Sequence, residues 1–273
     1  MSDRYAFMVS DRTGITAENL GLSLLCHFPT VQFKTVALPF VDSREKALDA
    51  VSQINDAAER SGQTPLVFAT LVDDEIRAAI SSSRGVIFDL FDAFLSPLEK
   101  ELGLASEHSV GSSHGVLDPQ KYTSRISALN YTMRVDDGMN IDHYDQADVV
   151  VIGVSRTAKT PTSLYLALHF GIFAANYPLI GEDLDRGRLP DRIVRHRKKL
   201  FGLTIDPERL QQIRSERYDR GRYAKLKQCQ YEVAQAEALF RRERIPYVDT
   251  TSKSVEEIAA TILHRAHLKR DLM

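Results

Sequence analysis

The chain has 273 residues, of which 26% are charged and 43% hydrophobic, and its formal net charge is −2. This length allows one large domain or two ordinary ones, and the composition is typical of a soluble globular protein. A net charge so close to zero provides no broad positive field for nucleic acid. No apolar run approaches the roughly 20 residues of a membrane helix. We therefore expect neither a nucleic-acid partner nor a membrane association.

The first residues lead directly into a strand-like segment, without the apolar region of a signal peptide. Cys26 and Cys229 are far apart in the sequence, and their spacing does not match a metal site. We expect both to be free, mostly buried thiols in a reducing compartment. Together these features predict a cytoplasmic protein.

The first hundred residues alternate between short apolar runs and segments with helical spacing. Strands are predicted over residues 5–10, 31–40, 65–71 and 85–90. Helices are predicted over residues 16–28, 44–61, 73–83 and 92–102. This alternation is typical of a parallel sheet covered by helices, so residues 1–105 are assigned to an N-terminal α/β domain.

The turn from Ser10 to Glu18 joins the first predicted strand to the first predicted helix. Backbone amides at such a helix start can bind an anion. A simple helix cap is the favoured explanation of the same residues, because one glycine alone is weak evidence for an anion site.

Residues 106–144 are predicted to be a linker and connecting segment, because Ser and Gly dilute the apolar residues in its first part. Asp136-Asp137-Gly138 lies near its end. This tripeptide is either a solvated acidic turn or a pair of carboxylates for acid–base chemistry.

Residues 145–273 are assigned to a second α/β domain of nucleotide-binding, kinase-like type. A buried strand over residues 147–152 precedes a short loop, and a helix with Pro161 in its first turn follows it. The loop consists of Gly153, Val154, Ser155, Arg156, Thr157, Ala158, Lys159 and Thr160. A strand, a tight loop and Lys-Thr at a helix start form the setting of a phosphate-binding P-loop.

Each part of this loop suggests a role in binding a nucleotide. The loop amides and the helix start would face phosphate oxygens. Lys159 would reach a terminal phosphate, and the Thr160 hydroxyl would ligate Mg²⁺. Ala158 stands where the usual pattern has a second glycine. A left-handed conformation there would cost alanine about 1 kcal/mol or more.

The rest of the second domain supplies one further candidate acid. Strands are predicted over residues 174–180, 200–205 and 246–249, and helices over residues 207–218, 223–243 and 254–266. Asp206 follows the strand that ends at residue 205, at the edge of the sheet where ligands gather in open α/β folds. It could ligate Mg²⁺ or accept a hydroxyl proton, and it also has the position of a helix N-cap before Pro207.

Two basic stretches are further candidates for contact with a phosphoryl group. They are residues 192–199 and the set Arg214, Arg217, Arg220 and Arg222. Arginines can neutralise a transferring phosphoryl group, although solvated helix faces are the commoner structure. His114 and His196 have no spacing that specifies a metal.

Together these residues resemble the bacterial phosphoenolpyruvate synthase regulatory proteins, relatives of the pyruvate, phosphate dikinase regulatory proteins. The resemblance spans nearly the whole chain and rests on several motifs. They are Ser10-Asp11 with Thr16-Ala17-Glu18, Leu38-Pro39-Phe40-Val41, Asp136-Asp137-Gly138, Gly153-Val154-Ser155-Arg156 with residues 159–167, Ala174-Ala175-Asn176-Tyr177-Pro178 and residues 201–210. Two positions depart from the pattern: Ala158 replaces a usual Ser or Gly, and Val135 replaces a frequent His.

The resemblance implies two opposed activities on phosphoenolpyruvate synthase. ADP phosphorylates a threonine beside the catalytic histidine of that enzyme and inactivates it. Inorganic phosphate then removes the phosphoryl group as pyrophosphate and restores activity. The resemblance also implies that residues 153–160 bind ADP. In this scheme Lys159 acts on the phosphate, and Asp206 or Asp137 orients the threonine hydroxyl.

Two other functions fit the same loop. A small-molecule kinase would use it without a protein partner, and a nucleotide sensor would bind without catalysis. The sequence does not specify an oligomeric state, and a homo-oligomer is compatible with it.

Overall fold

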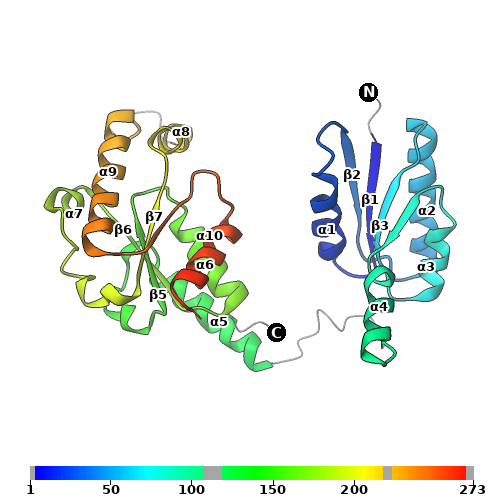
Figure 1. The fold of residues 1–273 in the computed structure, drawn as a ribbon, viewed down its shortest axis with the longest axis horizontal. Helices are drawn as coiled ribbons and strands as arrows, with labels where there is room; N and C mark the ends of the chain where they lie inside the picture. The colour runs from blue at the N-terminus through cyan, green and yellow to red at the C-terminus, as the bar shows by residue number, and fades with distance from the viewer. Residues whose placement is uncertain (1–3, 107–118, 218–222, 269–273) are drawn as a thin grey trace. The chain divides into compact units, whose positions relative to one another are not determined.

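The computed structural model describes residues 4–106, 119–217 and 223–268, and the chain divides into two compact units, Met1–Gly115 and Val116–Met273. Each unit contains a four-stranded parallel sheet with helices packed on it (Figure 1). The predicted α/β class is therefore confirmed. Because the division falls at Gly115, the helix and turns that precede residue 145 belong with the second unit.

The first unit has the strand order β2-β1-β3-β4. Its elements are β1 (Arg4–Ser10), α1 (Ile15–Leu25), β2 (Phe33–Leu38), α2 (Arg44–Ser61), β3 (Leu66–Thr70), α3 (Asp74–Ser81), β4 (Val86–Asp89) and α4 (Asp92–Leu102). Alternate residues of β1 enter different cores. Phe7 and Val9 pack with α2 and α3, whereas Ala6 and Met8 pack with α1. Burial on both faces explains why the central strand β1 is a continuous apolar run.

The second unit repeats this arrangement, with the strand order β6-β5-β7-β8. Its elements are α5 (Pro119–Arg134), η1 (Asp136–Gly138), η2 (Ile141–Gln146), β5 (Val149–Gly153), α6 (Lys159–Phe170), β6 (Ala174–Pro178), α7 (Gly181–Arg186), η3 (Val194–Lys199), β7 (Leu200–Thr204), α8 (Pro207–Arg217), α9 (Leu226–Glu243), β8 (Tyr247–Asp249) and α10 (Val255–Arg265). In both units the first and third strands along the chain are neighbours. From these two strands the chain continues toward opposite edges of the sheet. Ligands of open α/β sheets bind at the carboxyl ends of two such strands.

The central strand β5 divides the second unit into two cores. Val149 and Val151 pack with α6 and α10, and Val150 and Ile152 pack with α9 on the other face. The strand therefore has no exposed side, and its carboxyl end at Gly153 is held rigidly in the middle of the sheet.

Two helices have the bounds that the sequence predicts, and these are α2 and α4. At the start of α10, Ser254 and Glu257 form a reciprocal capping box. The α5 helix was missed because its sequence is rich in Ser, Thr, Asn and Tyr, which are weak helix formers. Its packing against α6 supplies the stabilisation that its local sequence does not.

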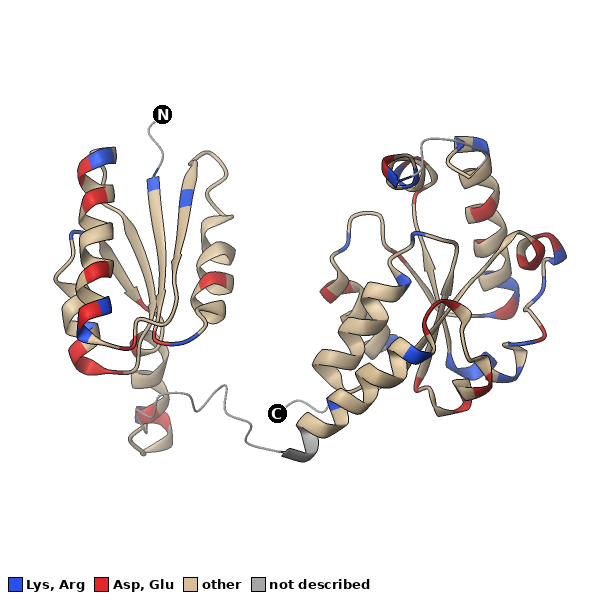
Figure 2. Ribbon diagram, turned by 180° about the vertical axis from the view of Figure 1, so that it is seen from behind, with Lys and Arg blue, Asp and Glu red and all other residues tan. Residues whose placement is uncertain are grey.

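The expectation of two buried thiols is wrong for one of them. Cys229 is buried in α9, but Cys26 is exposed, because it follows the last turn of α1 and donates to the carbonyl oxygen of Ser23. Within the described ranges no helix is long and apolar enough to cross a membrane. Acidic and basic residues are intermixed along the ribbon of both units (Figure 2).

Gly153 allows β5 and β7 to approach closely at the start of the candidate loop. A Cβ atom at this position would lie 2.5 Å from the carbonyl oxygen of Leu203. Since a backbone atom cannot yield easily, we expect Gly153→Ala to lower the free energy of unfolding by about 1–3 kcal/mol. Urea denaturation measures the change.

Gly181→Ala is the matched control, because a Cβ atom at Gly181 would meet no atom within 4 Å. It should leave the stability within about 0.5 kcal/mol of the wild type. Equal stability of the two variants would contradict the close packing at Gly153.

Candidate functional site

The loop between β5 and α6 curls back on its own backbone. Thr157 Oγ1 donates to the carbonyl oxygen of Val154 at 3.0 Å, and Lys159 Nζ donates to the same oxygen at 2.9 Å. Arg156 and Ala158 adopt left-handed conformations, with φ of 76° and 62°. The residues predicted to form a strand, a tight loop and a helix start do so.

Ala158 therefore has the positive φ that the sequence analysis identified as a cost. The strain is about 1–2 kcal/mol relative to glycine. As the N-cap residue of α6, alanine also has no side-chain acceptor for the first-turn amides. These amides are left to bind another group at the helix start, where the helix dipole favours an anion.

Lys159 is 5% exposed, although it carries the terminal ammonium group of the loop. Burial lowers the pKa of Lys159 to about 8. Asp137 and Asp136 oppose this shift, whereas Arg214 and Arg156 reinforce it. The loop thus holds a partly desolvated cation that is influenced both by carboxylates and by arginines.

The Asp136–Gly138 turn reaches the loop through one of its carboxylates. Asp136 Oδ1 accepts a hydrogen bond from Thr160 Oγ1 at 2.9 Å and another from Asn176 Nδ2. The backbone N–H of Asp137 donates to Asn176 Oδ1 at 3.0 Å. Asp137 itself has a φ of 52°. The two carboxylates are therefore part of the site and not a solvated turn distant from the loop.

Asn176 is a site residue that the sequence analysis did not assign. It is fully buried in β6. Its side-chain amide forms hydrogen bonds with Asp136 and with the backbone N–H of Asp137. Its backbone carbonyl oxygen accepts a hydrogen bond from Tyr144 Oη at 2.6 Å. The sequence feature that could have revealed this role is an amide side chain inside a predicted buried strand, since a buried polar group requires hydrogen-bond partners.

Arg214 was predicted to lie on a solvated helix face, and that expectation is wrong. The residue is 1% exposed and donates to the carbonyl oxygens of Ser155 and Tyr223 at 3.1 and 3.0 Å. It also pairs with Glu232 at 2.6 Å and stacks on the Tyr223 ring. These partners bind its two terminal nitrogens and offset the cost of burying the charge, whereas Nε is buried without a hydrogen-bond partner among the described residues.

Tyr223 extends this contact to the loop itself. Its hydroxyl lies 2.9 Å from Ser155 Oγ. Arg214 and Tyr223 thus hold Ser155 by its carbonyl oxygen and its side chain, which fixes the outer part of the loop. Arg220 and Arg222 lie outside the described residues.

Comparison with known proteins places the chain in a family. The family model described as kinase/pyrophosphorylase matches residues 6–263. The chain belongs to the kinase/pyrophosphorylase family.

Relatives with similar sequences match over nearly the entire chain. A protein of Alkalilimnicola ehrlichii is 54% identical over 269 residues, which cover 98% of this chain and 98% of the relative. A protein of Halorhodospira halophila is 53% identical, with 98% of each chain covered, and one of Hahella chejuensis is 49% identical, with 98% and 99% covered. All three carry the name "Putative phosphoenolpyruvate synthase regulatory protein".

In this member of the kinase/pyrophosphorylase family, Asp206 serves as a helix cap. Its Oδ1 accepts from the backbone N–H groups of Glu208 and Arg209 at 2.9 and 3.0 Å, at the start of α8. Asp206 also follows β7, the strand beside β5, so it lies at the same edge of the sheet as the loop. The cap is confirmed, and a chemical role for Asp206 stays a prediction.

The oxygen atoms beside the loop suit a hard divalent cation. Thr160 Oγ1 and Asp136 Oδ1 lie 2.9 Å apart. Over the described ranges, no group of three His, Cys, Asp or Glu residues could hold a metal ion. Mg²⁺ is compatible with this arrangement because it retains several waters and uses one or two carboxylates together with substrate phosphates.

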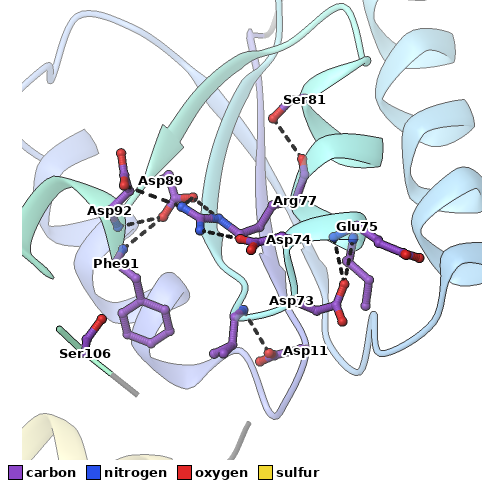
Figure 3. A network of polar contacts seen from close by, with 12 residues as sticks. Asp11, Asp73, Asp74, Glu75, Arg77, Ser81, Asp89, Phe91, Asp92 and Ser106 are labelled. Atoms are coloured by element: carbon purple, nitrogen blue, oxygen red, sulfur yellow. Dashed lines mark hydrogen bonds and ion pairs between the residues drawn. The ribbon is translucent and has the colours of Figure 1, made fainter. Parts of the chain in front are cut away.

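The Ser10–Glu18 turn of the first unit is held by bonds within that unit (Figure 3). Asp11 Oδ2 accepts from the backbone N–H of Val72 at 3.1 Å, which joins the ends of β1 and β3. Arg77 pairs with Asp89 at 2.8 Å and with Asp74 at 3.2 Å. Gly14, with a φ of 78°, provides the N-cap of α1. The Asp11 bond and the Gly14 cap give the turn a structural role, and anion binding there stays a prediction.

The bonds of Asn176 provide a direct test of the acidic turn. Asn176→Asp retains an oxygen that accepts from the backbone N–H of Asp137, but it places a second carboxylate beside that of Asp136. The repulsion should raise the pKa of the carboxylate pair in the folded state. Folding then favours the protonated form, so the loss of stability should grow as the pH rises from about 4 to 8.

Asn176→Ala separates this charge effect from the loss of hydrogen bonds. It leaves buried polar groups without partners and should cost about 1–3 kcal/mol at every pH in this range. Denaturant titrations at several pH values measure both variants. Parallel pH profiles for the two would contradict the position of Asn176 beside Asp136.

Proposed function

We propose that this chain regulates phosphoenolpyruvate synthase in the cytoplasm as an ADP-dependent protein serine/threonine kinase and a phosphate-dependent, pyrophosphate-forming phosphorylase. The observation that carries the proposal is the buried Lys159 at the start of α6, flanked by Asp136 and Asp137. Membership of the kinase/pyrophosphorylase family and the names of the full-length relatives support the two activities and the target.

In the forward reaction the threonine hydroxyl of the synthase attacks the β-phosphorus of ADP. The new bond joins the threonine oxygen to phosphorus, the bridging P–O bond breaks, and AMP leaves. The hydroxyl proton passes to a carboxylate and then to water. Such transfers depend mainly on alignment and on stabilisation of the charge on phosphate oxygens.

The residues of the loop supply this stabilisation. The ammonium group of Lys159 and the free amides at the start of α6 would bind the β-phosphate oxygens. Arg214 and Tyr223 keep Ser155 in place, so the outer part of the loop is already fixed when the phosphate binds.

Asp137 is the carboxylate that we assign to the threonine hydroxyl. Asp136 is engaged by Thr160 and Asn176, and the Oδ1 atom of Asp206 is engaged by two amides of α8. Asp137 receives its support through its backbone N–H, which leaves its carboxylate free to act on the substrate. Asp206 is the second candidate at this edge of the sheet.

Thr160 and Asp136 would hold the Mg²⁺ ion that accompanies ADP. Such an ion neutralises charge on the phosphate oxygens. Thr160 Oγ1 and Asp136 Oδ1, which lie 2.9 Å apart, are the atoms that would hold it.

The reverse reaction uses the same contacts. An oxygen of inorganic phosphate attacks the phosphorus of phosphothreonine, the bond to the threonine oxygen breaks, and pyrophosphate leaves while the threonine oxygen takes up a proton. Phosphate can bind where the terminal phosphate of ADP binds, whereas water gains no comparable contacts.

The decisive experiment is incubation of the chain with the synthase and ADP, followed by mass spectrometry of the synthase. The proposal expects phosphothreonine and AMP in equal amounts. Binding of ADP without transfer would instead indicate a nucleotide sensor.

Lys159→Ala should lower the rate of transfer by about 10²–10³-fold, because one preorganised contact to the transferring group is lost. The rate of phosphothreonine formation measures the effect, and circular dichroism verifies that the variant is folded. Near-normal activity in a folded variant would exclude this role for Lys159.

The affinity for ADP should depend on pH through Lys159, whose pKa is lowered to about 8. The phosphate binds the charged form and raises this pKa, so binding should take up protons near pH 8.5 and weaken as the pH increases further. Calorimetry in buffers of different ionisation enthalpy measures the uptake. The uptake should be lost in Lys159→Ala, and its persistence there would assign it to another group.

Removal of the phosphoryl group should require added phosphate. Pyrophosphate should form in proportion to the phosphate supplied, ADP should inhibit, and Lys159→Ala should impair the reaction as it impairs phosphorylation. A pyrophosphate assay on the phosphorylated synthase tests this. Rapid dephosphorylation in phosphate-free buffer would identify an ordinary phosphatase.

A further inference from the structure

A cavity of about 440 Å³ opens beside the acidic turn of the second unit. Gly138, Asn140 and Asp142 line it from the segment that follows Asp137. Asp191, Arg192 and Arg195 line it from the segment that leads into β7. Its size lies within the range of small-ligand sites.

The cavity and the loop share the acidic turn as a common border. Asp136 bonds to Thr160 of the loop, and Gly138, two residues further on, lines the cavity. Gly138 also packs against Tyr177 and Pro178 at the end of β6, where a Cβ atom would lie 3.3 Å from Pro178. A group bound in the cavity would therefore lie beside the acidic turn, in contact with Gly138, the residue that follows Asp137.

Three of the four charged residues in the cavity lining already have partners of opposite charge. Arg195 lies 3.9 Å from Asp142, and Asp191 lies 3.7 Å from Arg188. Arg192 forms no hydrogen bond or ion pair with any described part of the chain. Its charge acts on the neighbouring Tyr177, whose pKa burial and Asp183 raise to about 12 against the opposing effect of Arg192.

We infer that this cavity binds the polypeptide segment of the protein substrate that carries the acceptor threonine, and that Arg192 pairs with an acidic side chain of that segment. The inference rests on the proposed function. Transfer to a protein hydroxyl requires the residues on either side of the threonine to lie along the surface next to Asp137. The cavity provides that surface, and Arg192 provides its unneutralised charge.

The test uses Arg192→Glu in the full chain with the synthase and ADP. The KM for the synthase should rise about tenfold, because the variant places like charges opposite each other. The kcat and the dissociation constant of ADP, measured by calorimetry on the chain alone, should stay within twofold of the wild type. Arg192→Lys, which retains the charge, should raise KM less than Arg192→Glu.

Lys198→Glu is the matched control, because it reverses one exposed charge in the neighbouring η3 without lining the cavity. Its KM should stay within twofold of the wild type. Charge reversal of one acidic residue near the modified threonine of the synthase should restore the KM of Arg192→Glu. That rescue would support the pairing.

Four outcomes would overturn the inference. They are an unchanged KM in Arg192→Glu, an equal rise in Lys198→Glu, a weakened affinity for ADP, and a raised KM that no charge reversal restores. A wild-type chain that leaves the synthase unmodified would instead refute the proposed function, and this inference with it. Failure of the inference alone leaves wild-type phosphorylation intact.

Discussion

The ammonium group of Lys159 is buried at the start of α6, where the carbonyl oxygen of Val154 accepts its hydrogen bond at 2.9 Å. A buried cation costs several kcal/mol unless opposite charges lie close to it. Asp136 and Asp137 provide these charges, and they can do so only because Asn176 holds the side chain of one and the backbone of the other. The loop therefore depends on the acidic turn. It also depends on Gly153, where β5 and β7 approach closely.

The two units have the same strand order but different side chains at the corresponding edge of the sheet. Each places its first and third strands side by side, with their carboxyl ends at the same edge of the sheet. In the first unit the groups at this edge bind one another, as Asp11 does with the backbone N–H of Val72. In the second unit the edge retains a buried lysine, free first-turn amides and an acidic turn. The difference in local chemistry, rather than topology, makes the second unit the candidate catalytic unit.

The sequence was informative where local pattern determines structure. Continuous apolar strands, the loop from Gly153 to Thr160 and the cap at Asp206 follow from nearest-neighbour chemistry, and all were predicted. Asn176 and Arg214 were missed because their roles depend on partners 40 and 59 residues away in the chain. Nothing near Arg214 in the sequence indicates that Ser155 and Glu232 will surround it. The α5 helix was missed for a related reason, since packing against α6 rather than propensity stabilises it.

The proposed function depends on the loop of residues 153–160 holding the terminal phosphate of ADP against Lys159. A crystal structure of the chain with ADP and Mg²⁺ tests this without an assay. The β-phosphate should lie within hydrogen-bond distance of Lys159 Nζ and the first amides of α6, and Thr160 and Asp136 should hold the cation. A β-phosphate bound away from Lys159, with the Val154 contact of this lysine intact, would show that the loop does not bind the transferred group.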